Sequence, residues 1–156
     1  MRLAFLALAL CLAFPVAHAH DDDDSRDGRD GQSISHVNRG ITAEAGRRYG
    51  DLETVNGGIT IKQTRVQGRI ETVQGDIIVG NGSVVQGGIL VTKPQGIRWG
   101  RNRTPRIVIG PNATVNGALR FEREVELFVH PSAKIGAVSG ATVQRYTDSL
   151  PPRRND

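Results

Sequence analysis

The sequence predicts an all-β protein built as a single-stranded parallel β-helix (a β-solenoid) of about five coils, each of about 18 residues. Three observations support this fold class. One short motif returns every 18 residues, Val and Ile recur six residues apart, and the 156 residues include 19 Gly but only one Trp, two Tyr and four Phe. The alternative is an antiparallel sandwich in which Asn-Gly and Gln-Gly pairs form hairpin turns, but such hairpins do not usually keep a constant period.

The main repeat is a pentad that begins with Val-Asn or Val-Gln, contains Gly and ends with Ile. It occurs as VNRGI, VNGGI and VQGDI, and each copy begins 18 residues after the last, at Val37, Val55 and Val73. A second motif, in which Leu or Ile follows Gly by two residues, recurs at spacings of 18 and 19 residues, beginning at Gly50, Gly68 and Gly87. Two interleaved motifs of nearly equal period indicate stacked structural units.

A finer six-residue spacing predicts which side chains face inward. It links Val73, Val79, Val85 and Val91, and later Ile109, Val115, Phe121 and Leu127. An 18-residue unit cannot bury its apolar face alone, so we expect three short strands joined by tight corners to make each coil. Gly and Asn suit the corners because tight bends often need positive φ. In this register Val73 and Ile77 point inward, whereas Gln74 and Asp76 point outward and tolerate substitution.

The predicted solenoid covers residues 37–143. Its coils are expected at 37–54, 55–72, 73–91, 107–126 and 127–143, with an insertion at 93–106 that interrupts the stack. Residues 144–156 are predicted to be a C-terminal cap or tail. Val143, Tyr146 and Leu150 have helical spacing, and the two prolines at 151–152 stop whatever they form. We expect this segment to fold over the last coil.

Residues 1–19 are predicted to be a signal peptide, in which Arg2 precedes an apolar run of 12 residues and small residues occupy positions 17 and 19. A bilayer span needs roughly 20 apolar residues, which disfavours a membrane anchor. Bulky Leu10 disfavours lipoprotein cleavage before Cys11. We therefore expect an exported protein that begins at His20, lies in the periplasm or is secreted to the cell surface, and has neither a cysteine nor a membrane span.

Residues 20–36 are predicted to be an acidic, disordered arm. Residues 20–31 hold six Asp and two Arg, a net charge of −4, whereas residues 32–156 hold 17 basic and 10 acidic residues, a net charge of +7. The arm is polar and lacks the apolar periodicity that a packed segment requires.

The insertion at 93–106 is the predicted ligand-binding site. Its basic residues are Lys93, Arg98, Arg101, Arg103 and Arg106, with Trp99 among them and no acidic residue. Arg suits sulfate, phosphate or carboxylate partners, and Trp can stack on a sugar ring. The predicted partner is an anionic polysaccharide or another cell-envelope component rather than nucleic acid. The alternative is a solubilising loop whose Ile97 and Trp99 fold back on the solenoid wall.

No catalytic residue, resident metal or cofactor is predicted. His130 lies in a turn and has no second motif to support acyl transfer. Glu122, Glu124 and Glu126 alternate along the sequence and would share one strand face, where a carboxylate pair can hydrolyse a glycosidic bond. A solvated strand face explains the same pattern. The His20 amine and imidazole could chelate copper, although no second His is obviously placed against them.

The pentads and the unit at 109–117 (IGPNATVNG) give the chain a family resemblance over about 37–143. It resembles the bactofilin-like, polymer-forming domains and the secreted adhesin-like β-solenoids of bacteria. The resemblance implies a parallel β-helix used as a scaffold, surface or assembling element. Unpaired strand edges at the coil ends allow self-association, which we expect the cap and the acidic arm to limit to small oligomers. This chain departs from cytoplasmic bactofilins in its signal peptide and in the insertion. The expected function is therefore that of an exported, non-enzymatic scaffold or surface-interaction protein, with binding of anionic cell-envelope polysaccharide as the alternative.

Overall fold

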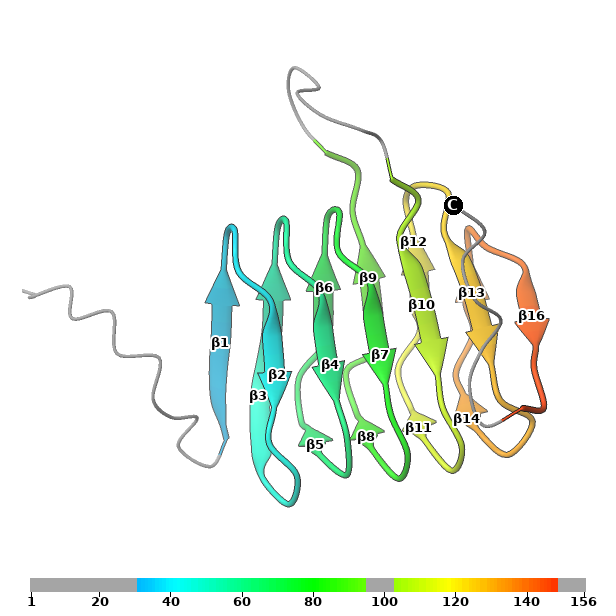
Figure 1. Cartoon of the computed structure of the whole chain (residues 1–156), viewed down its shortest axis with the longest axis horizontal. Helices are drawn as coiled ribbons and strands as arrows, with labels where there is room; N and C mark the ends of the chain where they lie inside the picture. Colours follow the sequence, from blue (N-terminus) through cyan, green and yellow to red (C-terminus); the bar gives the residue numbers. More distant parts are fainter. Residues whose placement is uncertain (1–30, 95–102, 149–156) are drawn as a thin grey trace, which may run out of the picture.

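The computed structural model describes residues 31–94 and 103–148, which contain sixteen strands and no helix. The strands are parallel and stack as a β-solenoid of about six turns, with about 19 residues between equivalent positions (Figure 1). The predicted fold class is confirmed. The predicted signal peptide, residues 20–30 of the arm, Arg98, Trp99, Arg101 and residues 149–156 lie outside the described residues.

Three strips of strands run along the solenoid, and we number them faces 1 to 3. Face 1 is a six-stranded sheet of β2 (Ile41–Ala43), β4 (Ile59–Ile61), β7 (Ile77–Val79), β10 (Arg106–Ile109), β13 (Glu126–Val129) and β16 (Val143–Arg145). Face 2 comprises residues 48–49 of β3 (Arg48–Thr54) with β5 (Arg65–Val66), β8 (Val84–Val85), β11 (Thr114–Val115) and β14 (Lys134–Ile135). Face 3 comprises β1 (Gln32–His36), residues 52–54 of β3, β6 (Ile70–Thr72), β9 (Ile89–Val91), β12 (Leu119–Phe121) and β15 (Val138–Ser139). Because β3 continues from face 2 to face 3, these two faces form one ten-stranded sheet.

The core consists of aliphatic ladders that run along the solenoid axis. Successive coils pair in register, so each coil adds one buried side chain to each ladder. The ladder of face 1 is Ile41, Ile59, Ile77, Ile107 and Leu127. The ladder of face 3 is Leu52, Ile70, Ile89 and Leu119. Neighbouring strands lie about 4.8 Å apart, which lets branched aliphatic side chains of adjacent coils pack directly on one another.

The prediction that Val73 points inward is wrong, because the buried residue at this corner is its neighbour Thr72. Along β6, Ile70 and Thr72 face inward, and the side chain of Val73 is only half-buried. The Thr72 hydroxyl accepts a hydrogen bond from the N–H of Gly75 at 3.0 Å, which satisfies the buried oxygen. Thr54 accepts one from Gly57 in the same way, at 3.2 Å. A local hydrogen bond therefore allows a polar residue to occupy the core at this corner.

The glycines of the pentads are required by close approach of backbones at successive corners. A Cβ atom on Gly75 would overlap the carbonyl group of Gly57, and one on Gly57 would overlap the carbonyl group of Arg39. The corners stack this closely because the coils keep one register. The repeated Gly thus marks a packing contact between coils.

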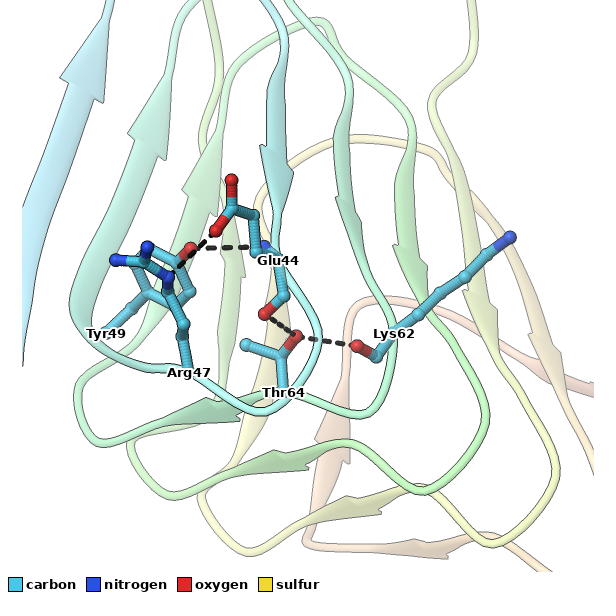
Figure 2. Close-up of polar contacts among 5 residues, drawn as sticks. All are labelled: Glu44, Arg47, Tyr49, Lys62 and Thr64. Atoms are coloured by element: carbon cyan, nitrogen blue, oxygen red, sulfur yellow. Dashed lines mark hydrogen bonds and ion pairs between the residues drawn. The ribbon is translucent and has the colours of Figure 1, made fainter. Parts of the chain in front are cut away.

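Polar contacts close the corner between faces 1 and 2 in the first coils (Figure 2). The hydroxyl oxygen of Tyr49, whose ring is buried, accepts a hydrogen bond from the Glu44 N–H at 3.1 Å. The Thr64 hydroxyl lies 2.7 Å from the carbonyl oxygen of Lys62 and 3.1 Å from that of Glu44. Arg47 Nε is 2.8 Å from Glu44 Oε2, whereas the side chain of Lys62 extends away from the group. Side chains of two successive coils thereby satisfy the backbone at this corner.

The solenoid extends beyond the predicted range at both ends. β1 pairs with β3 and places Ile34 opposite Leu52, so residues 32–36 belong to the first turn and not to a disordered arm. At the other end, β16 pairs with β13 and places Val143 opposite Leu127. Residues 143–145 therefore form a strand and not the helical segment that their spacing predicted. In both places an apolar residue continues an existing ladder, and this outweighs the local sequence signal. These partial coils explain why the structure has about six turns rather than five.

Tyr146 packs against the side of the solenoid. The predicted cap would have placed it over the end of the last coil. Tyr146 instead covers Val108 and Phe128, which point outward from face 1, and all three side chains are buried. The Tyr146 hydroxyl donates a weak hydrogen bond to the carbonyl oxygen of Ile109 at 3.4 Å. Its ring meets the His130 ring edge to face, with 5.5 Å between the ring centres. Burial raises the pKa of the Tyr146 hydroxyl above its ordinary value of 10.0.

Ile77, a ladder position, and Val73, a corner position, give a direct test of the register. Replacing Ile77 with Ala should lower the free energy of unfolding by about 2–5 kcal/mol, because a fully buried aliphatic side chain is lost. Replacing Val73 with Ala should lower it by less than about 1 kcal/mol, because this side chain is half-buried. Urea denaturation of the two variants measures both values. Equal losses would contradict the register described above.

Candidate functional site

The insertion replaces one corner of the solenoid, where the chain passes from face 3 to face 1. The chain leaves β9 after Val91 and enters β10 at Arg106. In the adjacent coils this corner is a short connection, made of residues 73–76 between β6 and β7 and residues 122–125 between β12 and β13. Because β9 pairs with β6 and β12, and β10 pairs with β7 and β13, these two connections flank both ends of the insertion.

Asp76 fastens the returning end of the insertion. Its Oδ2 lies 2.8 Å from Arg103 Nη2, and its Oδ1 accepts a hydrogen bond from the backbone N–H of Arg106 at 2.8 Å. The Asp76 side chain is 30% exposed and that of Arg103 is 62% exposed, so the ion pair lies at the solvent boundary. A charge-assisted bond to a backbone N–H fixes position as well as charge. One carboxylate therefore sets where the insertion rejoins the wall.

Arg123 repairs the gap that the insertion leaves in the stack of corners. In the preceding coils the N–H of Asn56 donates to the Val37 carbonyl and the N–H of Gln74 donates to the Val55 carbonyl. The Val73 carbonyl instead accepts from Arg123 Nη1, at 3.0 Å. Nη2 of the same side chain donates to the Arg103 carbonyl at 3.2 Å. The guanidinium thus joins the two connections and the insertion.

Arg106 belongs to strand β10. The prediction from the sequence, which placed it on a ligand-binding loop, is wrong on this point. The Arg106 guanidinium carbon lies 4.6 Å from the centre of the Phe128 ring, a cation–π geometry. Its Nε is buried and has no hydrogen-bond partner in the structure. The strand register carries the side chain to this place because Arg106 lies opposite Glu126 and alternates with outward-facing Val108. Arg106 therefore packs on the wall and is less accessible to a ligand than was predicted.

The structure brings together only part of the predicted site. Lys93 is exposed at the departing end of the insertion, Arg103 is exposed and paired with Asp76, and Arg106 lies on the wall. The predictions for Arg98, Trp99 and Arg101 lie outside the described residues.

Sequence reasoning missed two residues of this network, Asp76 and Arg123. The prediction that Asp76 tolerates substitution does not fit its two contacts at the root of the insertion, with the Arg103 guanidinium and the Arg106 N–H. Asp76 occupies the position that Gly58 holds in the preceding pentad, next to an Ile that pairs with the first ladder residue after the insertion. That departure from the repeat was the available signal. Arg123 acts across 50 residues, and no spacing in the sequence reveals such a contact.

The three glutamates do not share one strand face, because residues 122–125 form the connection and only Glu126 lies in β13. His130 lies at a corner, where its Nδ1 is 2.8 Å from Ser132 Oγ. Within the described ranges no group of three or more His, Cys, Asp or Glu side chains is placed to hold a metal ion. Across residues 31–94 and 103–148, no helix is long and apolar enough to cross a membrane.

Replacing Asp76 with Ala should lower the free energy of unfolding by about 1–3 kcal/mol, because it leaves the Arg106 N–H and the Arg103 guanidinium without this acceptor. Replacing Arg103 with Ala should cost about 0.2–1 kcal/mol, as for other pairs at the solvent boundary. Chemical denaturation gives both values, with exposed Gln74→Ala as the control. Equal stability of the Asp76 and Gln74 variants would contradict the anchoring role.

Comparison of the chain with models of known protein families, with curated protein sequences and with solved structures finds no match. The resemblance to bactofilin-like and adhesin-like domains therefore stays a prediction from the sequence. The conclusion from the structure itself is a β-solenoid whose insertion is fastened to the wall by Asp76 and Arg123.

Proposed function

We propose that the protein is an exported, non-enzymatic β-solenoid that acts as a scaffold or surface-interaction protein. The observation that supports this proposal is the network at the root of the insertion, where Asp76, Arg103 and Arg123 fasten the loop to a continuous β-wall. A loop with a fixed root loses less conformational entropy when it binds a partner. In this proposal the solenoid is a rigid frame that presents the insertion to a binding partner.

The second candidate function is a binding module for anionic cell-envelope polysaccharide, through the insertion. Its support is the charge of residues 93–106, which hold five basic residues and no acidic residue. Asp76 neutralises part of this charge at Arg103. The binding contribution is therefore expected to come mainly from Lys93, Arg98 and Arg101, with stacking by Trp99.

We also propose that the protein self-associates through its coil ends. At the C-terminal end the inner positions Ile135, Val138 and Val143 are only half-buried, although they continue the core ladders. β14, β15 and β16 each pair with one described strand and have a second edge. Such edges recruit other chains unless they are covered. We expect these edges to support only small oligomers of the mature chain, because the acidic arm carries a net charge of −4 over residues 20–31 and would repel its own copy.

Retention on an acidic polysaccharide column tests the binding function. We expect Arg98→Ser/Arg101→Ser to elute at clearly lower salt than the parent, because exposed charge pairs are screened within about 10 Å at 0.1 M salt. The matched control is Arg120→Ser/Arg145→Ser, which removes two exposed charges from other parts of the wall. Trp99→Ala should weaken retention without lowering the melting temperature. A lower melting temperature with unchanged retention would instead identify Trp99 as packed on the wall.

Light scattering tests assembly. The mature chain is expected to form monomers or small oligomers. Truncation after Thr142 removes β16 and Tyr146, which exposes the edge of β13 and the outward side chains of Val108 and Phe128, so the mass should rise. Truncation after Asp148 keeps the strand and the tyrosine and serves as the control. Unchanged mass after both truncations would count against self-association through this end.

A further inference from the structure

Face 2 presents two columns of outward side chains along the solenoid axis. The first column is Arg48, Arg65, Val84, Thr114 and Lys134, one residue from each paired strand. The second column consists of the residues that directly follow three of these strands, Gln67, Gln86 and Asn116, all exposed. None of these eight described positions is acidic. The cations of the first column lie at its two ends, and no acid within the two columns offsets them.

Faces 2 and 3 each place two like charges opposite each other on paired strands. On face 3, Glu53 and Glu71 lie opposite each other on paired strands, and the Arg69 guanidinium lies 3.9 Å from the first carboxylate and 3.2 Å from the second. On face 2, Arg48 and Arg65 lie opposite each other in the same way. No described acidic side chain forms an ion pair with Arg65. Arg48 takes part in another interaction, whereas the exposed Arg65 guanidinium is open to an external anion.

The corner between faces 1 and 2 adds a further cation beside face 2. Arg47 pairs with Glu44 at 2.8 Å, whereas the exposed Lys62 side chain extends away from that carboxylate (Figure 2). Lys62 therefore adds a cation close to Arg65 on the next strand without adding an acid. Arg65 and Lys62 thus belong to the coil that contains β4 and β5, and Lys134 lies three strands further along face 2.

The amide column supplies neutral hydrogen-bonding groups between the basic ends. Asn116 Nδ2 donates to Gln86 Oε1 at 2.6 Å, which fixes the orientation of both exposed amides. Each primary amide offers two donors and one acceptor oxygen with two lone pairs, so this one bond leaves further capacity on both side chains. Paired coils repeat about every 4.8 Å along the axis. A linear polymer laid along the axis would meet one amide in each of three coils.

We infer that face 2 binds a linear acidic polysaccharide along the solenoid axis, with Arg65 and Lys134 contacting carboxylate groups and the amides contacting sugar hydroxyls. This surface is distinct from the insertion, which leaves the corner between faces 3 and 1. Nucleic acid is the less suitable polyanion, because none of the eight positions carries an aromatic side chain on which a base could stack. The inference does not depend on ligand binding by the insertion.

The test measures binding of the mature chain to polygalacturonate at low salt, in an Arg98→Ser/Arg101→Ser background that removes two charges of the insertion. Arg65→Ser/Lys134→Ser should weaken binding about five- to tenfold, since two exposed charge contacts are lost. The matched control, Arg120→Ser/Arg145→Ser, has the same net charge and should change binding less than about twofold. Equal weakening in both double variants would show a net-charge effect and overturn the inference.

A second variant tests the amide column separately. Gln86→Glu keeps an oxygen that accepts the Asn116 hydrogen bond but places an acid in the middle of the face, so it should weaken binding while the melting temperature holds. Unchanged binding of this variant would show that the polymer does not cross face 2. Tighter binding of a single-stranded oligonucleotide than of polygalacturonate would overturn the assignment of the partner.

Discussion

In-register parallel pairing of each coil with the next is the constraint on which the rest of the structure depends. The pairing forces every coil to follow one backbone path, so a side chain that points inward in one coil points inward in all of them. This places Ile59 between Ile41 and Ile77 and continues the ladder to the last complete coil. The same constraint brings Gly75 against Gly57, where no Cβ fits. Core and corners are thus two results of one register.

The insertion is accommodated because it interrupts the register only at a corner. The strands on both sides keep their partners, with Ile107 opposite Ile77 across the break. At this corner, side chains make hydrogen bonds to the backbone in place of the bonds between backbones that the other corners make. The Asp76 carboxylate binds the Arg106 N–H on one side, and the Arg123 guanidinium binds the Val73 carbonyl on the other. The cost of the interruption is therefore limited to one corner.

Much of the fold could be predicted from the sequence, because one register copied along the axis leaves a period that is visible in the residues. The period does not reveal which of two neighbouring residues at a corner faces inward. Thr72 and Val73 are neighbours, and only the hydrogen bond to Gly75 explains why the polar residue is the buried one. The site was less predictable, since Arg103 and Arg106 were identified by charge alone. Their partners Asp76 and Arg123 come from other coils, and contacts of that kind follow from the stack and not from local sequence. The ends were misjudged because pairing with an existing strand overrides weak local signals, as in Val143–Arg145.

The contact between Arg123 and the Val73 carbonyl has a consequence for the order in which the chain becomes structured during synthesis. The coils can pair one after another as they emerge, since each needs only the coil before it. The corner at the insertion differs, because its guanidinium is encoded 50 residues after the carbonyl that it binds. This corner stays incomplete until the following coil has been made and has paired. A nascent chain halted within the insertion would therefore display an unfinished edge, to which chaperones or a second nascent chain would have access.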